Sequence, residues 1–269
     1  MRIGNKEFKL GERTYIMGIL NVTPDSFSDG GKFNEIEAAV AQAKKLVEDG
    51  ADIIDIGGES TRPGADFVSE DEEIRRVVPI IKAIKKEMDI TISIDTYKNK
   101  TAEEAVKAGA DIINDIWGAK YDENIAKVAA KYDVPIILMH NRKDIPYVNL
   151  IDDVINDLQE SIDIALRNGV KRENIILDPG IGFAKTYEEN LKVMNNCEKV
   201  KEMGYPVLLG TSRKSMIGLT LNLPPLERVE GTVATTVMGI MKGLEFVRVH
   251  DVLENKRAAL MTDAILRVK

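Results

Sequence analysis

The chain has 269 residues, of which 44% are apolar, and a formal net charge of −7. This length and apolar content suffice for a substantial buried core, and the acidic balance argues against a general nucleic-acid-binding surface. The single cysteine, Cys197, excludes an intrachain disulfide framework.

The N-terminal segment IGNKEFKLGERT, residues 3–14, predicts a small β-hairpin. Eight apolar runs follow, and most are rich in Ile, Val and Leu, as parallel strands covered on both faces should be. These predicted strands are Tyr15–Leu20, Asp52–Gly58, Ile90–Asp95, Asp111–Ile116, Pro135–His140, Ile175–Asp178, Pro206–Gly210 and Phe246–Asp251. Between them, as in Asn34–Gly50, apolar residues recur at helical spacing and a glycine follows the last turn.

Strand and helix thus alternate eight times over about 250 residues, which matches the (β/α)8 TIM barrel. The hairpin would close the bottom of this barrel. An open doubly wound sheet is the alternative. Because no linker is apparent, we expect residues 1–269 to form one domain.

The sequence also predicts where the protein resides. A lone cysteine is typical of a reducing, intracellular environment. The opening residues lack the apolar core of a signal peptide, and no apolar run approaches the roughly 18 residues that span a bilayer. We therefore expect a cytoplasmic protein with no membrane and no nucleic-acid partner.

A barrel of this type carries its active site on the loops at the carboxyl ends of its strands. All eight predicted strands end in or beside polar residues, and both histidines of the chain, His140 and His250, are among them. Any one of these residues can be a helix cap or a turn side chain. Their joint occurrence at one end of the barrel favours an active site.

Two kinds of subsite are indicated by charge. Asp95, Asn114 and Asp178 end apolar strands, where an unpaired carboxylate is costly, so they favour a flat heterocycle that presents N–H donors. Asp178 can alternatively cap its own turn. A cationic set suits an anion such as phosphate, and it comprises Arg62, Lys214, Arg248 and His250. For Arg248 and His250, which share one strand face, a salt bridge inside the barrel is the alternative.

The segment GTSRKS, Gly210–Ser215, leads from a strand into a helix, so its backbone N–H groups can bind a phosphate or a carboxylate. Neither a zinc-type Cys/His cluster nor a P-loop is present. The metal expected is a hard cation such as Mg²⁺, with Asn21 and Asp29 as its candidate ligands.

Eight segments resemble motifs of the dihydropteroate synthase family, in the family's order. Met17–Gly31 (MGILNVTPDSFSDGG) and Ile54–Ala65 (IDIGGESTRPGA) are similar to its two signatures, and the others are SIDT, INDIWG, LMHNR, LDPGIGFAKT, GTSRKSMIG and RVHDV. The resemblance covers nearly the whole chain. It implies a pterin-binding barrel, a homodimer, that joins 6-hydroxymethyl-7,8-dihydropterin pyrophosphate to p-aminobenzoate and releases pyrophosphate.

The resemblance also implies a role for individual residues. The pterin would be held by Asp95, Asn114, Met139, Asp178 and Lys214. The pyrophosphate would be bound by Asn21, Arg62, Arg248 and His250, with Mg²⁺ on Asn21 and Asp29. The p-aminobenzoate would be enclosed by Phe27, Thr61, Pro63, Phe183 and Ser215.

The chemistry is expected to be dissociative, with Asp95, Lys214, Arg248 and His250 as the catalytic residues. Breaking the C–O bond at the pterin methylene leaves a cation, which the Asp95 charge can stabilise. Two rivals stay open on sequence grounds. One is a related pterin-binding methyltransferase domain that serves a corrinoid, and the other is a pterin-binding protein without turnover.

Overall fold

The computed structural model describes residues 1–22, 31–60, 66–143 and 146–268. Eight parallel strands form one sheet in the order β8-β7-β6-β5-β4-β3-β10-β9. In chain order they are β3 (Tyr15–Asn21), β4 (Ile53–Gly57), β5 (Thr91–Asp95), β6 (Ile112–Asp115), β7 (Ile136–Met139), β8 (Ile175–Asp178), β9 (Leu208–Leu209) and β10 (Phe246–Val249). An isolated parallel bridge between Leu177 and Val207 joins β8 to the start of β9 and closes the barrel.

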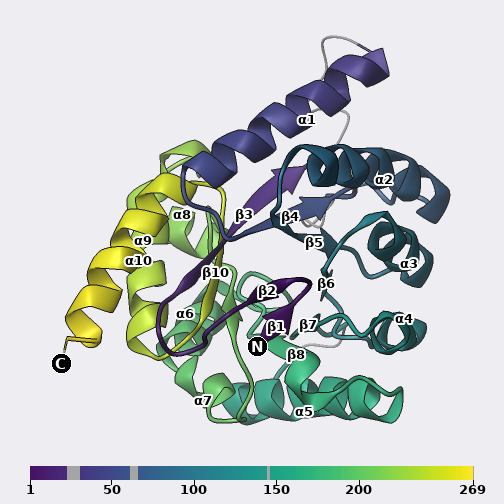
Figure 1. Ribbon diagram of the computed structural model, residues 1–269. Helices are drawn as coiled ribbons and strands as arrows, with labels where there is room; N and C mark the ends of the chain where they lie inside the picture. Colours follow the sequence, from purple (N-terminus) through teal and green to yellow (C-terminus); the bar gives the residue numbers. More distant parts are fainter. Residues whose placement is uncertain (23–30, 61–65, 144–145, 269) are drawn as a thin grey trace.

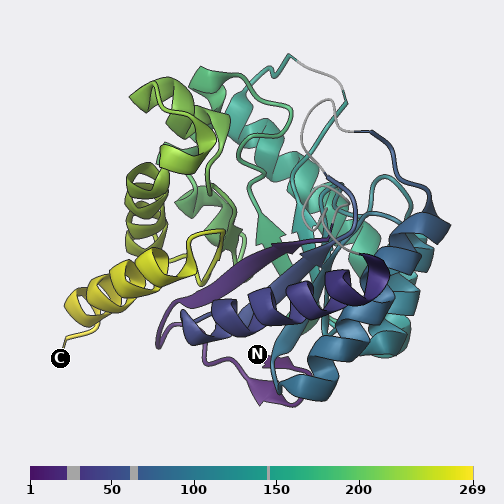
Figure 2. The same ribbon diagram turned by 90° about the horizontal axis from the view of Figure 1, so that it is seen from above.

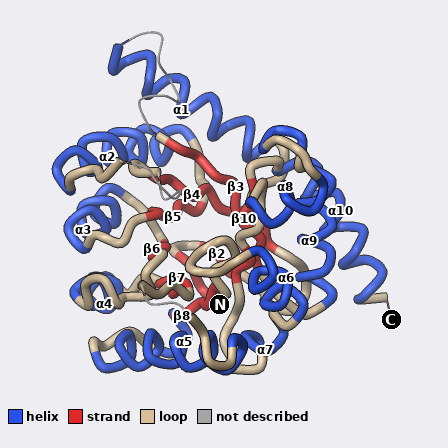
Figure 3. The backbone as a smooth tube through the Cα atoms, turned by 180° about the vertical axis from the view of Figure 1, so that it is seen from behind, coloured by secondary structure: helices blue, strands red, loops and turns tan. Residues whose placement is uncertain are grey.

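Helices alternate with the strands and surround the barrel (Figure 1, Figure 3). They are α1 (Gly31–Glu48), α2 (Glu70–Glu87), α3 (Asn99–Ala108), α4 (Asn124–Tyr132), α5 (Leu150–Arg167), α6 (Tyr187–Asn195), α7 (Glu198–Lys201), α8 (Ser215–Leu221), α9 (Val229–Met241) and α10 (Val252–Leu266). The TIM-barrel prediction is confirmed, and the open-sheet alternative is wrong because the strands follow chain order around the sheet and the Leu177–Val207 bridge joins its two end strands.

The N-terminal hairpin is present, although its strands are short: β1 (Arg2–Ile3) and β2 (Lys6–Glu7). It covers the bottom of the barrel (Figure 2). Ile3 and Phe8 are buried in the same apolar cluster as Tyr15 and Phe246, which lie on β3 and β10. The hairpin therefore closes the lower end of the barrel with apolar side chains.

Strand alternation divides the core into two parts. A larger cluster lies between the sheet and the helices and includes Ile54, Ile56, Ile92 and Ile94. The neighbouring residues of the same strands have the opposite orientation and face the barrel axis. The residues that face the axis are apolar low in the barrel and polar higher up. On β4, for example, Ile53 belongs to the lower cluster, and Asp55 follows two positions later on the same face.

The predicted strand Pro206–Gly210 is reduced to the two residues of β9. Just before it, the Glu245 carboxylate accepts a hydrogen bond from the Val207 backbone N–H at 2.9 Å. Equivalent bonds occur at the starts of other strands. Asp52 accepts from Ile16 N–H, Asp111 from Ile92 N–H and Asp263 from Thr14 N–H, at 2.7 to 2.9 Å. Acidic side chains thus satisfy backbone donors at the bottom of the barrel.

Within the described residues, no helix has the length and apolar character needed to cross a membrane.

We expect Asp263→Ala to lower the free energy of unfolding by about 1–3 kcal/mol, because it leaves the buried Thr14 N–H without its acceptor. Asp263 lies on α10, so the bond ties the last helix to the beginning of β3. Urea denaturation measures the change. Asp163→Ala on the exposed face of α5 is the matched control, and equal losses in the two variants would contradict the assignment.

Candidate active site

The upper half of the barrel interior is polar, and its side chains come from the carboxyl ends of the strands. Asp95, Asn114, Met139 and Asp178 are the last or next-to-last residues of β5, β6, β7 and β8, and each is at most 6% exposed. Arg248 projects from β10 on the opposite side of the barrel. The structure thus brings together residues that are up to 153 positions apart in the chain.

Arg248 lies between two carboxylates. Its Nη2 donates to Asp95 Oδ2 at 2.6 Å, and its Nε donates to Oδ2 of Asp55, which is fully buried on β4. The amide of Asn114 donates to the same Asp55 oxygen at 3.1 Å. The salt bridge inside the barrel, an alternative at the sequence level, is therefore present for Arg248, and the acidic and cationic groups meet in one network.

This network leaves polar atoms unsatisfied. Among the described residues, Asp55 Oδ1, Asp95 Oδ1 and Ser93 Oγ are buried without a hydrogen-bond partner. A buried acceptor without a donor is unfavourable by about 1–3 kcal/mol. The free oxygen of Asp95 is therefore suited to a ligand that brings N–H groups into the barrel mouth.

The other side of the mouth is formed by Asp178, Lys214 and Phe183. Asp178 Oδ1 accepts from the Gly180 backbone N–H at 2.7 Å, so this carboxylate does cap its own turn with one oxygen. Lys214 precedes α8, and its Nζ lies 4.0 Å from the centre of the Phe183 ring. Gly182, with a φ of +84°, lets the loop pass the Lys214 side chain, because a Cβ there would lie 2.7 Å from Lys214 Cδ.

Burial changes the pKa values of these groups. It raises the pKa of Asp95 to about 7, against the opposing effect of Arg248, and that of Asp178 to about 6. It lowers the pKa of Lys214 to about 8. Burial also opposes the charge of Arg248, but Asp55 and Asp95 outweigh it and raise the pKa of the guanidinium above its ordinary value. Groups that titrate near neutral pH in one cleft are typical of active sites.

His250 and Ser215 lie near the end of β10 and the start of α8. The Ser212 hydroxyl contacts His250 Nδ1 at 3.0 Å and accepts from the His250 backbone N–H at 3.1 Å. Arg213, with a φ of +58°, is held to Asp251 by two hydrogen bonds. Ser215 is exposed as the first residue of α8.

Several predicted site residues are not among the buried groups of the barrel mouth. Asn21 is exposed at the end of β3. Phe27, Asp29, Thr61, Arg62 and Pro63 lie outside the described residues. In the described part of the chain, no group of three or more Asp, Glu, His and Cys side chains could hold a metal ion.

The sequence-level search missed Asp55, because it considered only the ends of strands. The sequence nevertheless contains a signal that identifies Asp55. Asp55 interrupts an apolar run in DIIDIGG at a position that shares a strand face with Ile53 and Gly57. A charged residue on the inward face of a buried strand requires a partner.

A second network that the sequence did not indicate lies just after β4. The Lys98 ammonium is buried and contacts the carboxylates of Glu59 and Glu73. Glu59 also accepts from the Val68 backbone N–H at 3.1 Å. This bond joins described residues that flank the segment 61–65, which lies outside the described residues.

The comparisons with known proteins agree with this geometry. The model of the pterin binding enzyme family matches residues 17–250. A dihydropteroate synthase of Clostridium beijerinckii is 70% identical over 99% of this chain and 100% of its own length. A crystal structure of a Clostridium difficile dihydropteroate synthase in the presence of pteroic acid is 55% identical, with a TM-score of 0.95 over 97% of this chain and 100% of that one. A Xanthomonas albilineans dihydropteroate synthase with 4-aminobenzoic acid is 41% identical, with a TM-score of 0.91 over 96% and 94% of the two chains.

A closed barrel with a buried, partly unsatisfied polar mouth and a family match over most of its length defines the class, and the chain belongs to the pterin-binding enzymes. Within that family its place is among the dihydropteroate synthases, which are transferases of folate biosynthesis. The resemblance seen in the sequence is thereby confirmed, and the corrinoid-dependent methyltransferase is not supported.

We expect Asp55→Asn to lower kcat/KM about tenfold or more, because Arg248 loses one of its two carboxylates. Asp115→Asn is the matched control. Asp115, on β6, is also fully buried, but within the described residues its carboxylate accepts only from the backbone N–H groups of Trp117 and Ala119. The control should reduce stability while the folded enzyme keeps its kcat/KM. Steady-state kinetics with a parallel unfolding curve separates the two effects, and unchanged kinetics in Asp55→Asn would disprove the role.

Proposed function

We propose that the barrel mouth binds 6-hydroxymethyl-7,8-dihydropterin pyrophosphate and p-aminobenzoate side by side and joins them by dissociative displacement. The observation that carries this proposal is the buried Asp95 carboxylate, which has one oxygen on Arg248 and one without a partner among the described residues. The direct test is pyrophosphate release by the purified protein, which should require both substrates and Mg²⁺.

The pterin is assigned to the acidic side of the mouth. Asp178 and Asp95 offer carboxylate oxygens to the ring N–H and amino groups, and a carboxylate can accept two parallel hydrogen bonds. Asn114 lies between them and Met139 forms an apolar wall of the pocket. Lys214 supplies a positive charge at the edge of this pocket. The solved neighbour with pteroic acid supports this assignment.

The pyrophosphate is assigned to Asn21, Arg62, Arg248 and His250. Within the described part of the chain, Arg248 uses Nε and one N–H of Nη2 on carboxylates, which leaves its other N–H groups for an anion. The Asn21 amide oxygen, with the Asp29 carboxylate outside the described residues, is the hard-oxygen donor type that Mg²⁺ prefers. When bound, Mg²⁺ would neutralise charge on the leaving pyrophosphate.

The p-aminobenzoate is assigned to the loops around Phe183. This ring and the exposed Ser215 are the described members of the predicted set, whose other members are Phe27, Thr61 and Pro63. The ring lies beside Lys214, which also belongs to the pterin pocket, so the two substrates would be adjacent. The solved neighbour with 4-aminobenzoic acid supports a subsite for this substrate.

The side chains around the mouth favour dissociative chemistry. A general base must reach the attacking amine, and the described histidines are engaged elsewhere. His140 is buried between Asp157 and Lys185, and burial lowers its pKa to about 4. His250 contacts Ser212. Catalysis would therefore depend on stabilising the leaving group with Arg248 and His250 and the pterin cation with Asp95.

We further propose a homodimer. Large apolar side chains are exposed on three helices that lie next to one another, α8, α9 and α10 (Figure 1). They include Leu219, Met241, Leu260, Met261 and Ile265, each at least 56% exposed. An apolar face of this kind marks an interaction site.

The chain is also proposed to act as one domain in the cytoplasm. Strands from residue 15 to residue 249 share a single sheet, which supports one domain. The one cysteine, Cys197, is buried and unpaired, as expected in a reducing compartment.

Asp178→Asn should weaken pterin binding by about 1–3 kcal/mol, because the amide presents an NH₂ group to a donor edge. In the wild type, affinity should fall as the pH drops through about 6, since protonation removes an acceptor from Asp178. The variant should lack this step. Calorimetric titration from pH 5 to 8 measures both effects, and wild-type affinity in the variant would remove Asp178 from the site.

The dissociative mechanism predicts a large normal secondary deuterium isotope effect at the pterin methylene on the chemical step. It also predicts that ¹⁸O at the bridge to carbon scrambles into non-bridging positions of recovered substrate, when a p-aminobenzoate analogue without the amine is present. Single-turnover kinetics and mass spectrometry provide the readouts. No isotope effect together with no scrambling would favour direct displacement.

A further inference from the structure

The loop between β8 and α6 connects the two substrate subsites. Its residue Gly180 donates to Asp178 Oδ1 at 2.7 Å, and its Phe183 ring lies against the Lys214 amine. Three of its residues have left-handed backbone conformations, with φ of +66° at Gly180, +84° at Gly182 and +47° at Ala184. The position of the Phe183 ring therefore depends on how this tightly turned backbone is held, whereas Asp178 is already fixed as the last residue of β8.

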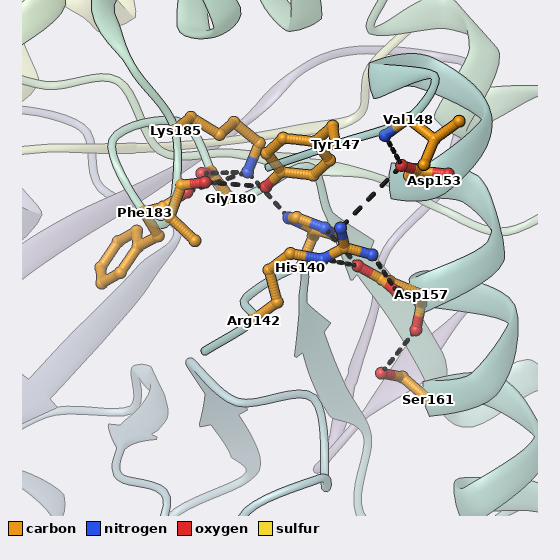
Figure 4. Close-up of polar contacts among 11 residues, drawn as sticks. His140, Arg142, Tyr147, Val148, Asp153, Asp157, Ser161, Gly180, Phe183 and Lys185 are labelled. Atoms are coloured by element: carbon orange, nitrogen blue, oxygen red, sulfur yellow. Dashed lines mark hydrogen bonds and ion pairs between the residues drawn. The ribbon is translucent and has the colours of Figure 1, made fainter. Parts of the chain in front are cut away.

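The main support of the loop is the Lys185 amine. Its Nζ donates to the backbone carbonyl oxygens of Gly180 at 2.9 Å and Phe183 at 3.1 Å, and to His140 Nδ1 at 2.8 Å (Figure 4). An ammonium has three N–H groups, and here each meets one acceptor. In the described chain, no carboxylate lies within ion-pair distance of this amine. The Lys185 amine is thus held by neutral acceptors rather than by an ion pair.

His140 is oriented to accept this bond. Its Nε2 lies 2.9 Å from Asp157 Oδ2 on α5, and Arg142 donates to both oxygens of that carboxylate, at 2.8 and 3.0 Å. Burial raises the pKa of Asp157, but these hydrogen bonds outweigh it and hold the pKa below its ordinary value. An ionised carboxylate only accepts, so Nε2 carries the proton and Nδ1 presents its lone pair to Lys185.

The loop also packs directly against the end of β7. A Cβ at Gly180 would lie 2.0 Å from the His140 carbonyl oxygen, so only glycine fits there. On the other side, the Tyr147 hydroxyl donates to the Ala184 carbonyl oxygen at 2.8 Å. Figure 4 shows Tyr147, His140 and Lys185 grouped around the loop backbone.

We infer that Lys185 is a positioning residue, which sets the place of the Phe183 ring, and with it the p-aminobenzoate subsite, by holding two carbonyl groups of the β8–α6 loop. This inference rests on the proposed function of Phe183. Through the hydrogen bonds that link Asp157, His140 and Lys185, helix α5 helps to hold the loop in place. In this role Lys185 acts through the Phe183 ring and needs no substrate contact of its own.

The charge state of Lys185 supplies a second readout. Burial lowers its pKa to about 7, and the charged groups that act on it are Asp178, Lys214, Asp157 and Glu189. His140 stays neutral through this range, because burial lowers its pKa to about 4. When Lys185 loses its proton, it keeps two N–H groups for three acceptors. The loop is therefore held best below neutral pH and less well above it.

The test compares Lys185→Met with Lys192→Met, an exposed lysine on the adjacent helix α6. We expect Lys185→Met to raise the KM for p-aminobenzoate about tenfold, with little change in kcat or in the KM for the pterin substrate. Lys192→Met should behave as the wild type. Lys185→Arg, which keeps the charge, should recover part of the loss. Equal kinetics in Lys185→Met and Lys192→Met would overturn the inference.

The pH dependence gives a test that needs no folded variant. In the wild type, the KM for p-aminobenzoate should rise between pH 6 and 8.5, and a KM that is constant over this range would overturn the inference. Where Lys185→Met folds, as checked by its unfolding curve, it should lack that rise.

Phe183→Ala distinguishes the two levels of the argument. If it raises the KM for p-aminobenzoate and Lys185→Met does not, only the role of Lys185 is wrong. If Phe183→Ala leaves this KM unchanged, the assignment of the p-aminobenzoate subsite is wrong, and the inference fails with it.

Discussion

The contact on which the barrel mouth depends is that of Arg248 with Asp55 and Asp95. Charges taken out of water lose several kcal/mol of hydration each, so such a group is tolerated only where the geometry is favourable and the hydrogen bonds are made. Here two strands supply carboxylates and a third supplies the guanidinium, and they lie above an apolar layer that admits no alternative partner. Asp55 Oδ1 and Asp95 Oδ1 are left without a partner among the described residues, which suits them to accept hydrogen bonds from a ligand.

A consequence is that binding and charge are coupled across the whole mouth. Asp95 and Asp178 have pKa values of about 7 and 6, and that of Lys214 is about 8, each shifted chiefly by burial. A ligand that brings donors to one carboxylate stabilises its ionised form and thereby favours the protonated form of Lys214. On the proposed assignment of the pterin to these residues, the site becomes fully charged when the pterin enters.

The sequence predicted the fold well because the determinants of a parallel barrel are local. Apolar runs such as Ile90–Asp95 predict buried strands. The segments between them have apolar residues at helical spacing, and few other architectures fit this alternation. The bounds were less certain, as at Pro206–Gly210, where only Leu208 and Leu209 form the strand. For the candidate site, the sequence indicated only residues at or beside the strand ends, and their roles stay predictions. Asp55 lies within a strand, and Lys185 acts through loop carbonyl groups. The roles of both residues depend on contacts between different elements of the barrel, such as the close approach of Gly180 to His140.

The pairing of β3 with β10 has a further consequence during protein synthesis. The first barrel strand has one of its two neighbours more than two hundred residues later in the chain, and Phe8 of the N-terminal segment packs against Phe246 of that last strand. A nascent chain on the ribosome therefore carries an unpaired β3 edge and uncovered apolar side chains until nearly all of it has been translated. Contacts of such long sequence separation form late and slowly. Intermediates with exposed strand edges are prone to aggregate, so this chain is most exposed to misassembly in the interval before β10 has been translated.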